Sequence, residues 1–220
     1  MRPMSLRARR MAAASGALCL AMTGLAAFAL AQSAHSDASP IRLGQTRVNV
    51  LTGRHALVTG WVQPADAGLQ VSLERRSGGR WSTVDHAITC AGGAFTLRFT
   101  PRRPGSAPIR IRVAGASPLA GTRRDVGRLN VYRHAKVSWY GPGLYGSRLG
   151  CGGVLRPGEL GVAHKALPCG SRVTLRHGAR ILRVRVIDRG PYVGGRDYDL
   201  TEATKQRLGF GGVGVILATA

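Results

Sequence analysis

The residues best suited to chemistry in this sequence lie in one short stretch. Val186–Thr201 holds three aspartates, two arginines and two tyrosines, interrupted by turn-forming glycines and a proline. Before it, the alternating run Ile181–Ile187 predicts a strand that delivers Asp188 to its end. Functional polar groups often lie on loops that a rigid sheet positions. The stretch is therefore a candidate for general acid–base chemistry by a carboxylate.

Each of these side chains also has a purely structural interpretation. Asp188 could cap the turn that follows it and pair with an arginine. Asp199 precedes a predicted helix, residues 201–208, which Gly209 would end, so its carboxylate could instead accept from backbone N–H groups at the helix start. Arg189 could merely neutralise a neighbouring aspartate.

The N-terminus has the parts of an export signal. Basic residues among positions 2–10 precede an apolar, Ala-rich run, Met11–Leu30, and Ala29–Ala31 offers a cleavage site. Residues 1–31 are therefore predicted to be a signal peptide, and the protein to be secreted and associated with the cell envelope. The apolar run is also about long enough to span a bilayer, so an uncleaved anchor is the alternative. Residues 32–45 are polar and small, which predicts a linker.

The sequence is strongly basic, with 32 lysines and arginines against 10 aspartates and glutamates. A positive field of this size favours polyanions such as nucleic acid, an anionic membrane surface or an acidic cell-wall polymer. Predicted export argues against nucleic acid as the partner, and no stable membrane insertion is expected unless the signal is retained. Sparse aromatic residues and 31 glycines favour short strands over long helices.

Residues 46–133 contain short segments in which apolar residues recur with a period of two. Turn signals such as Ser77–Gly79 and Ala91–Gly93 separate them, and the pattern is typical of an immunoglobulin-like β-sandwich. The segment holds no cluster of carboxylates, histidines or thiols, so no chemistry is assigned to it. The predicted strands are Val48–Val50, Ala56–Val62, Leu69–Leu73, Trp81–Val84, Ala94–Phe99, Ile109–Val113 and Leu129–Tyr132.

The last segment, residues 135–220, is richer in glycine and contains Cys151 and Cys169. In an exported protein these two cysteines are the natural disulfide pair, closing a loop of about twenty residues with a stabilisation of roughly 3 kcal/mol. A metal site is less favoured, because His164 is the histidine that lies near them. No metal and no cofactor are predicted.

Several motifs in this segment occur in an order and spacing that match one known family across nearly all of residues 135–218. They are Ser138–Gly143, Tyr145–Gly146, Ala163–Val173, Asp188–Tyr192 and Asp199–Thr201. These motifs resemble the rare lipoprotein A family. The resemblance implies a six-stranded double-psi β-barrel, so the chain is predicted to be all-β, with a sandwich followed by a barrel. It also implies action on peptidoglycan glycan strands, as a lytic transglycosylase.

The resemblance assigns roles to individual residues. The family's catalytic aspartate, in an Asp-Arg-Gly-Pro motif, corresponds to Asp188, and its site histidine corresponds to His164. The tyrosines are expected to stack on sugar faces or, equally, to be core residues, and Asp199 also corresponds to an aspartate of the related expansins. The expected substrate-binding residues are Tyr140, Tyr192, Arg189 and Asp199.

One family carboxylate is missing, because the family's glutamate, eleven residues before its histidine, corresponds to Gly153. Glycoside hydrolysis normally needs two carboxylates. In a lytic transglycosylase the sugar's own 6-hydroxyl closes a 1,6-anhydro ring in place of water, so Asp188 alone could act first as acid and then as base. Glu159 could take the missing group's place, although it also fits an exposed turn. The sequence thus predicts an endolytic lytic transglycosylase, with a non-catalytic, expansin-like peptidoglycan-binding module as the alternative.

Overall fold

The computed structural model describes residues 39–64, 67–114 and 119–220. The predicted signal peptide, residues 1–31, lies outside the described residues, as does the first part of the predicted linker. The linker prediction, residues 32–45, is wrong from residue 41 onward, because Ile41–Arg47 forms strand β1. This strand pairs antiparallel with β3 (Ala56–Val62), and Ile41 is buried in the core although the charged Arg42 follows it.

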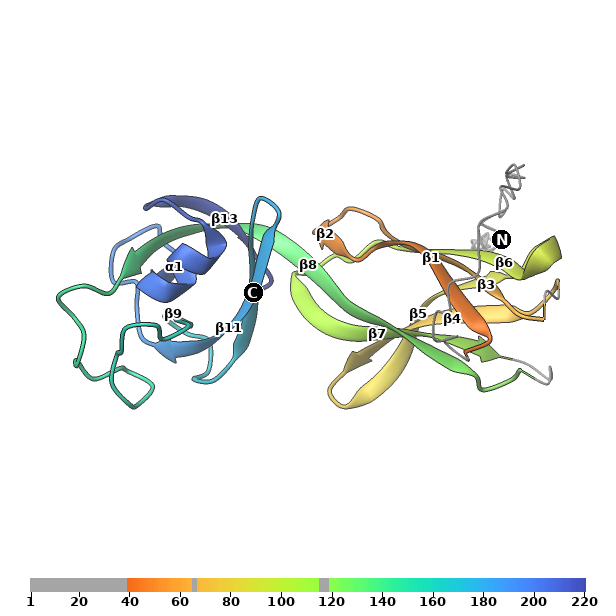
Figure 1. Cartoon of the computed structure of the whole chain (residues 1–220), viewed down its shortest axis with the longest axis horizontal. Helices are drawn as coiled ribbons and strands as arrows, with labels where there is room; N and C mark the ends of the chain where they lie inside the picture. Colours follow the sequence, from red (N-terminus) through yellow and green to blue (C-terminus); the bar gives the residue numbers. More distant parts are fainter. Residues whose placement is uncertain (1–38, 65–66, 115–118) are drawn as a thin grey trace, which may run out of the picture. The chain divides into compact units, whose positions relative to one another are not determined.

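The N-terminal half is built from two sheets that share one core (Figure 1). Its further elements are β2 (Asn49–Leu51), β4 (Gln70–Ser77), β5 (Arg80–Ile88), the 3-10 turn η1 (Ala91–Gly93), β6 (Ala94–Phe99), β7 (Gly105–Ala114) and β8 (Arg123–Tyr140). One sheet has the order β1-β3-β6, and in the other β8-β7-β4-β5 lie side by side, with β2 parallel to β8. Each of the seven predicted strands overlaps an observed one. The immunoglobulin-like assignment of this half stays a prediction.

Strand β8 belongs to both halves of the chain. Its first part pairs with β7 and β2, and from Arg133 onward it pairs with β13 (Gly214–Ala218) and then β12 (Tyr198–Thr201). The predicted boundary between residues 133 and 135 therefore falls inside one continuous strand of 18 residues. Ala135 and Val137 are buried and alternate with charged residues that are not, so the strand continues past the predicted boundary.

Six strands close the C-terminal half into a barrel. The set is completed by β9 (Gly161–Ala163), β10 (Arg172–His177) and β11 (Arg180–Asp188), and the hydrogen-bonded order β8-β12-β9-β11-β10-β13 returns to β8. The β8–β12 and β9–β11 pairs are parallel, and the other four are antiparallel. This confirms the predicted all-β class and its barrel. The interior includes Val137, Val162, Val173, Leu175, Val184, Val186, Tyr198 and Leu200.

Helix α1 (Glu202–Leu208) follows β12 directly. The Thr201 hydroxyl caps it by accepting from the Thr204 N–H at 3.3 Å, and Gly209 ends it in the left-handed conformation with φ 61°. The predicted helix is thus confirmed to within one residue. The interpretation of Asp199 as its cap is wrong, because Asp199 lies inside β12, where it pairs with β8 and β9. Within the described ranges, no helix is long and apolar enough to cross a membrane.

A long loop, residues 141–160, joins β8 to β9. An isolated bridge between Arg148 and Val154 gives it a local turn. The disulfide between Cys151 and Cys169, with 5.5 Å between the Cα atoms, ties this loop to the segment that joins β9 to β10. The predicted cysteine pairing is therefore confirmed, and the bridge holds two loops together beside the end of β11.

Candidate active site

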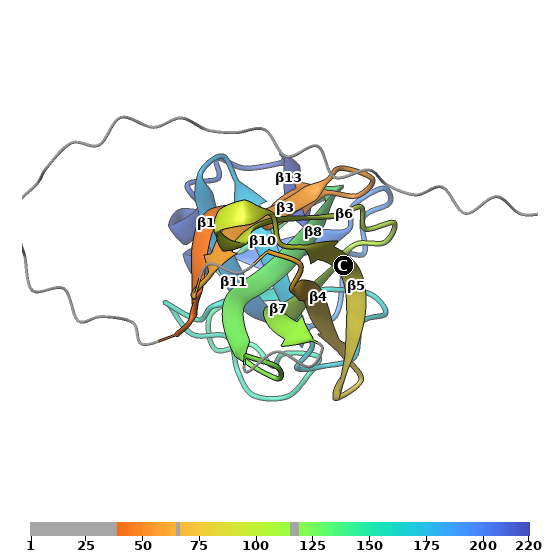
Figure 2. The same ribbon diagram turned by 90° about the vertical axis from the view of Figure 1, so that its right-hand side faces the viewer.

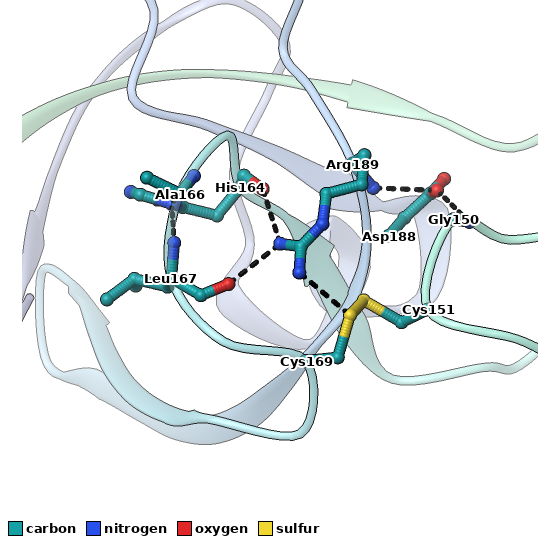
Figure 3. Close-up of a disulfide and its surroundings, with 8 residues drawn as sticks. All are labelled: Gly150, Cys151, His164, Ala166, Leu167, Cys169, Asp188 and Arg189. Atoms are coloured by element: carbon teal, nitrogen blue, oxygen red, sulfur yellow. Dashed lines mark hydrogen bonds between the residues drawn. A yellow bond between two sulfur atoms is a disulfide. The ribbon is translucent and has the colours of Figure 1, made fainter.

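Asp188 is the last residue of β11, and the backbone holds one of its carboxylate oxygens. Oδ1 accepts from the Gly150 N–H at 2.6 Å and from the Arg189 N–H at 2.8 Å (Figure 3). The carbonyl of Asp188 accepts from the His164 N–H at 3.1 Å, so the segment after β9 also fixes its position. Within the described residues no backbone N–H reaches Oδ2, while the Asp188 side chain as a whole lies beside the Tyr140 hydroxyl. One oxygen is thus oriented, and the other is available to exchange a proton.

Gly150 approaches Asp188 so closely because it has no side chain. A Cβ at this position would lie 2.8 Å from Arg189 Cγ and 3.0 Å from Arg189 N. Sequence reasoning missed this contact, since Gly150 precedes Asp188 by 38 positions and no local pattern joins them. The tight packing of the loop against Arg189 is what brings its N–H to the carboxylate.

Asp188 also lines a pocket of about 170 Å³. Loop 141–160 supplies most of the wall, while Tyr140 comes from the end of β8 and Asp188 from the end of β11. The volume is below the roughly 300 Å³ at which pockets for drug-sized ligands begin, so it fits part of a saccharide rather than a long segment. The lining residues are Tyr140, Leu144, Ser147, Arg148, Leu149, Leu155 and Asp188.

Tyr140 places a neutral hydroxyl among carboxylates. Burial, followed by the charge of Asp188, raises the pKa of Tyr140 well above its usual range, with further contributions from Asp199 and Glu159. Its Oη atom is buried without a well-formed hydrogen bond among the described residues, and a weaker side-chain hydrogen bond with Asp188 contributes to the raised pKa. Unpaired buried hydroxyls are costly. The Tyr140 hydroxyl is therefore a proton donor positioned beside the Asp188 carboxylate.

His164 uses its ring to hold its own loop. Nδ1 accepts from the N–H groups of Ala166 at 3.0 Å and Leu167 at 2.9 Å, which places the imidazole proton on Nε2. Burial, followed by the charge of Arg133, lowers the pKa of His164. The side chains of His164 and Asp188 point to opposite sides of Arg189 (Figure 3). The structure does not bring the two predicted catalytic side chains together, and a catalytic role for His164 stays a prediction.

Arg189 clamps the segment between β9 and β10. Its Nη1 donates to the carbonyls of His164 at 3.1 Å and Leu167 at 2.7 Å, and its Nη2 donates to Cys169 Sγ at 2.9 Å (Figure 3). These three bonds engage the guanidinium within the protein. The contact with substrate predicted for Arg189 remains untested, and its observed contacts are structural.

Asp199 faces the neighbouring strand β8. The hydroxyl of Ser138 donates to Asp199 Oδ1 and accepts from Arg196 Nη1 at 2.9 Å. Asp199 also lies close enough to Tyr140 to raise the pKa of that phenol. Its predicted binding role stays open. Sequence reasoning overlooked Ser138, although its motif and the β8–β12 pairing place it opposite Asp199.

Tyr192 is the most accessible of the predicted binding residues. Its side chain is 87% exposed in the turn after β11, and the adjacent Val193 is also exposed. Tyr192 is not among the residues that line the pocket. It is free to stack on a sugar outside the pocket, and that role stays a prediction.

Gly153, where the family has a carboxylate, adopts a backbone conformation that suits glycine. Its φ is +80°, and a Cβ there would meet no atom within 4 Å, so backbone strain rather than crowding disfavours a side chain. Glu159, on the same loop, is half-buried, and its carboxylate contributes to the raised pKa of Tyr140. It is thus the acidic group that loop 141–160 brings toward the pocket. No group of three His, Cys, Asp or Glu residues that could hold a metal ion occurs in the described part of the chain.

Comparison with known proteins identifies relatives of the barrel. A model of the lytic transglycolase family matches residues 133–219. The chain is 35% identical over 121 residues to the probable endolytic peptidoglycan transglycosylase RlpA of Synechocystis sp., a match that covers 49% of this chain and 37% of that protein. It is 38% and 42% identical, over 74 residues each, to the endolytic peptidoglycan transglycosylases RlpA of Campylobacter jejuni and Yersinia pestis, covering 33% of this chain and 27% and 21% of those proteins. The chain thus spans less than half the length of these relatives.

Proposed function

We propose that this protein cleaves peptidoglycan glycan strands as a lytic transglycosylase. The chain belongs, through residues 133–219, to the rare lipoprotein A family of double-psi β-barrel proteins. The observation that carries the proposal is Asp188, with Oδ1 held by two backbone N–H groups beside a pocket and Oδ2 left without a backbone donor. The relatives named as peptidoglycan transglycosylases support the substrate class. The protein would act in the cell envelope after export through residues 1–31.

The proposed reaction needs one carboxyl group. Protonated Asp188 donates its Oδ2 proton to the glycosidic oxygen as the bond from that oxygen to the anomeric carbon breaks. The resulting carboxylate then accepts the proton of the same sugar's 6-hydroxyl, whose oxygen bonds to the anomeric carbon. The product carries a 1,6-anhydro ring, no water is consumed, and Asp188 returns to its starting state. The second carboxylate that hydrolysis requires has no step here, which is compatible with glycine at position 153.

Tyr140 supports this chemistry from the pocket wall. Because its pKa is raised, its hydroxyl stays protonated and cannot compete with Asp188 as a base. It can donate a hydrogen bond to the Asp188 carboxylate or to a sugar oxygen, and either acceptor would satisfy the buried hydroxyl. Glu159 and Asp199 contribute negative charge near the place where positive charge develops on the sugar ring during cleavage.

The test is digestion of purified glycan strands that lack stem peptides. The purified protein should release fragments that end in 1,6-anhydro sugars, detected by mass spectrometry, and Asp188→Asn should lower release by at least about a hundredfold because the acid and base are both lost. Asp125→Asn makes the same chemical change at an exposed site outside the barrel, so it should leave release unchanged. Undiminished release by Asp188→Asn, at an unchanged melting temperature, would rule out this mechanism.

A second candidate function is non-catalytic binding of the cell wall, in the manner of an expansin. The specific observation in its favour is Gly153, which leaves the site without the family's second carboxylate. A binder would sediment with insoluble peptidoglycan and release no anhydro fragments. Release that depends on Asp188 would decide against it.

A further inference from the structure

Strands β10 and β11 carry arginines that the proposed reaction does not use. The two strands lie side by side (Figure 2). Arg172 lies directly opposite Arg185, and two residues further along Thr174 lies opposite Arg183. The three arginines are exposed, whereas the alternating residues of the same strands fill the barrel core. We call Arg172, Arg183 and Arg185 the arginine face.

No carboxylate balances the arginine face. Among the described residues, none of its three side chains takes part in an ion pair or a hydrogen bond to a protein group. Like charges directly opposite each other on a sheet are destabilising, so the Arg172–Arg185 pair opposes folding in the isolated protein. Burial, followed by the charges of Arg128 and Arg172, lowers the pKa of Arg183, as expected where cations crowd. An anionic partner would remove this repulsion.

We propose that the arginine face binds an anionic cell-wall polymer that carries phosphodiester groups along its chain. The planar guanidinium fork matches phosphate oxygens. Two arginines two positions apart on a strand are separated by about 7 Å, so the charges follow a line rather than surround a single ion. The other residues that alternate with the core here, buried Thr174, half-buried Arg176 and exposed Ile181, offer no aromatic ring on which bases could stack, which disfavours single-stranded nucleic acid.

The arginine face and Asp188 share a strand. Arg185 precedes Asp188 by three residues on β11, a separation of about 10 Å along the strand. A polymer bound at the arginine face would therefore hold the barrel on the wall with the pocket close to neighbouring glycan. This proposal rests on the envelope location but not on cleavage, because binding and product release are measured separately.

The test uses the whole protein with synthetic poly(glycerol phosphate) as the probe. Arg172→Gln/Arg183→Gln/Arg185→Gln should weaken binding by about tenfold or more, since three charge-assisted contacts are lost. The control Arg54→Gln/Arg102→Gln/Arg103→Gln removes the same three charges from exposed sites elsewhere and should weaken binding by less than about threefold. The arginine-face variant should also melt at a higher temperature than the wild type, because the cross-strand repulsion is gone.

Two outcomes would overturn the proposal. Equal weakening by both triple variants would mean that only net charge is sensed. Tighter, arginine-face-dependent binding to duplex DNA, or to vesicles containing anionic phospholipid, would assign the face to that partner instead. Loss of anhydro-fragment release with poly(glycerol phosphate) binding intact would count against the proposed cleavage alone, so the two proposals fail in distinguishable ways.

Discussion

In the proposed reaction Asp188 exchanges protons with the substrate, whereas Tyr140 keeps its own proton. The carboxylate of Asp188 is oriented through Oδ1 by two backbone donors. The hydroxyl of Tyr140 is kept neutral by burial and by the surrounding carboxylates. Because one residue is fixed by the backbone and the other by its environment, each can be changed while the other is kept.

Tyr140→Phe should lower kcat for fragment release by roughly tenfold, because a hydrogen-bond donor at the reacting groups is lost. KM should change little, since phenylalanine keeps the ring. Because the buried hydroxyl makes no well-formed hydrogen bond, its removal should change the melting temperature little. Steady-state kinetics and thermal melts measure these effects. An unchanged kcat would show that only the ring of Tyr140 matters.

Gly150→Ala should reduce both stability and fragment release. The new Cβ would lie 2.8 Å from Arg189 Cγ, so the loop must retreat and take its N–H away from Asp188. Overpacking of this kind costs about 1–3 kcal/mol. Urea denaturation and the digestion assay measure the two effects. Gly211→Ala is the matched control, because a Cβ there meets no atom within 4 Å, and equal effects of the two variants would contradict the explanation.

At the scale of elements, the segment after β9 is held in three ways. His164 binds its backbone, Arg189 binds its carbonyls, and the Cys151–Cys169 bridge ties it to loop 141–160. The two loops beside Asp188 therefore form one linked unit. Of these three sets of contacts, the hydrogen bonds to His164 depend on pH.

The two hydrogen bonds accepted by His164 Nδ1 predict a loss of folding stability in mild acid. Protonation of Nδ1 removes the acceptor for two N–H groups, and the folded-state pKa is lowered relative to about 6.5 in the unfolded chain. The stabilisation is therefore complete above the unfolded pKa and is lost as the pH falls from there through the folded pKa. Urea denaturation between pH 8 and pH 5 should show a smaller decline for His164→Asn, which keeps an acceptor that does not titrate. His86→Asn, at an exposed site, should decline like the wild type, and identical slopes for all three proteins would contradict the prediction.

Local sequence patterns predicted the elements better than the contacts between them. Alternation gave β3 and β6 their observed bounds and placed Asp188 at the end of β11. It missed β1, whose apolar residues stand among polar ones and become buried only by pairing with β3. The alternation pattern also placed a domain boundary inside β8, because charged residues interrupt the apolar ones there. Those charged residues face solvent, and the alternate positions of the strand stay buried. Neither the Gly150 donor nor the direction of the His164 ring has a local signal, since both depend on which distant loops meet.

At the scale of the whole molecule, acidic residues are few and unevenly placed. Of the 10 in the sequence, Glu159, Asp188, Asp197, Asp199 and Glu202 lie within residues 133–219. Three of these five raise the pKa of Tyr140. The barrel therefore combines carboxylates around Tyr140 with basic outer strands, an arrangement that suits the proposed binding of an anionic polymer.

The continuity of β8 makes one chain segment a structural member of two cores. Melting either core would strip hydrogen-bond partners from a strand that the other needs, so the described chain should unfold as a single cooperative unit with a calorimetric to van't Hoff enthalpy ratio near one. Leu129→Ala, at a 2% exposed position of β8, should lower the whole transition, at a cost of about 2–5 kcal/mol. Two calorimetric peaks, of which only one shifts, would contradict this. A substitution far from the pocket would then weaken the proposed activity through the shared strand, because it increases the fraction of molecules in which both cores are unfolded.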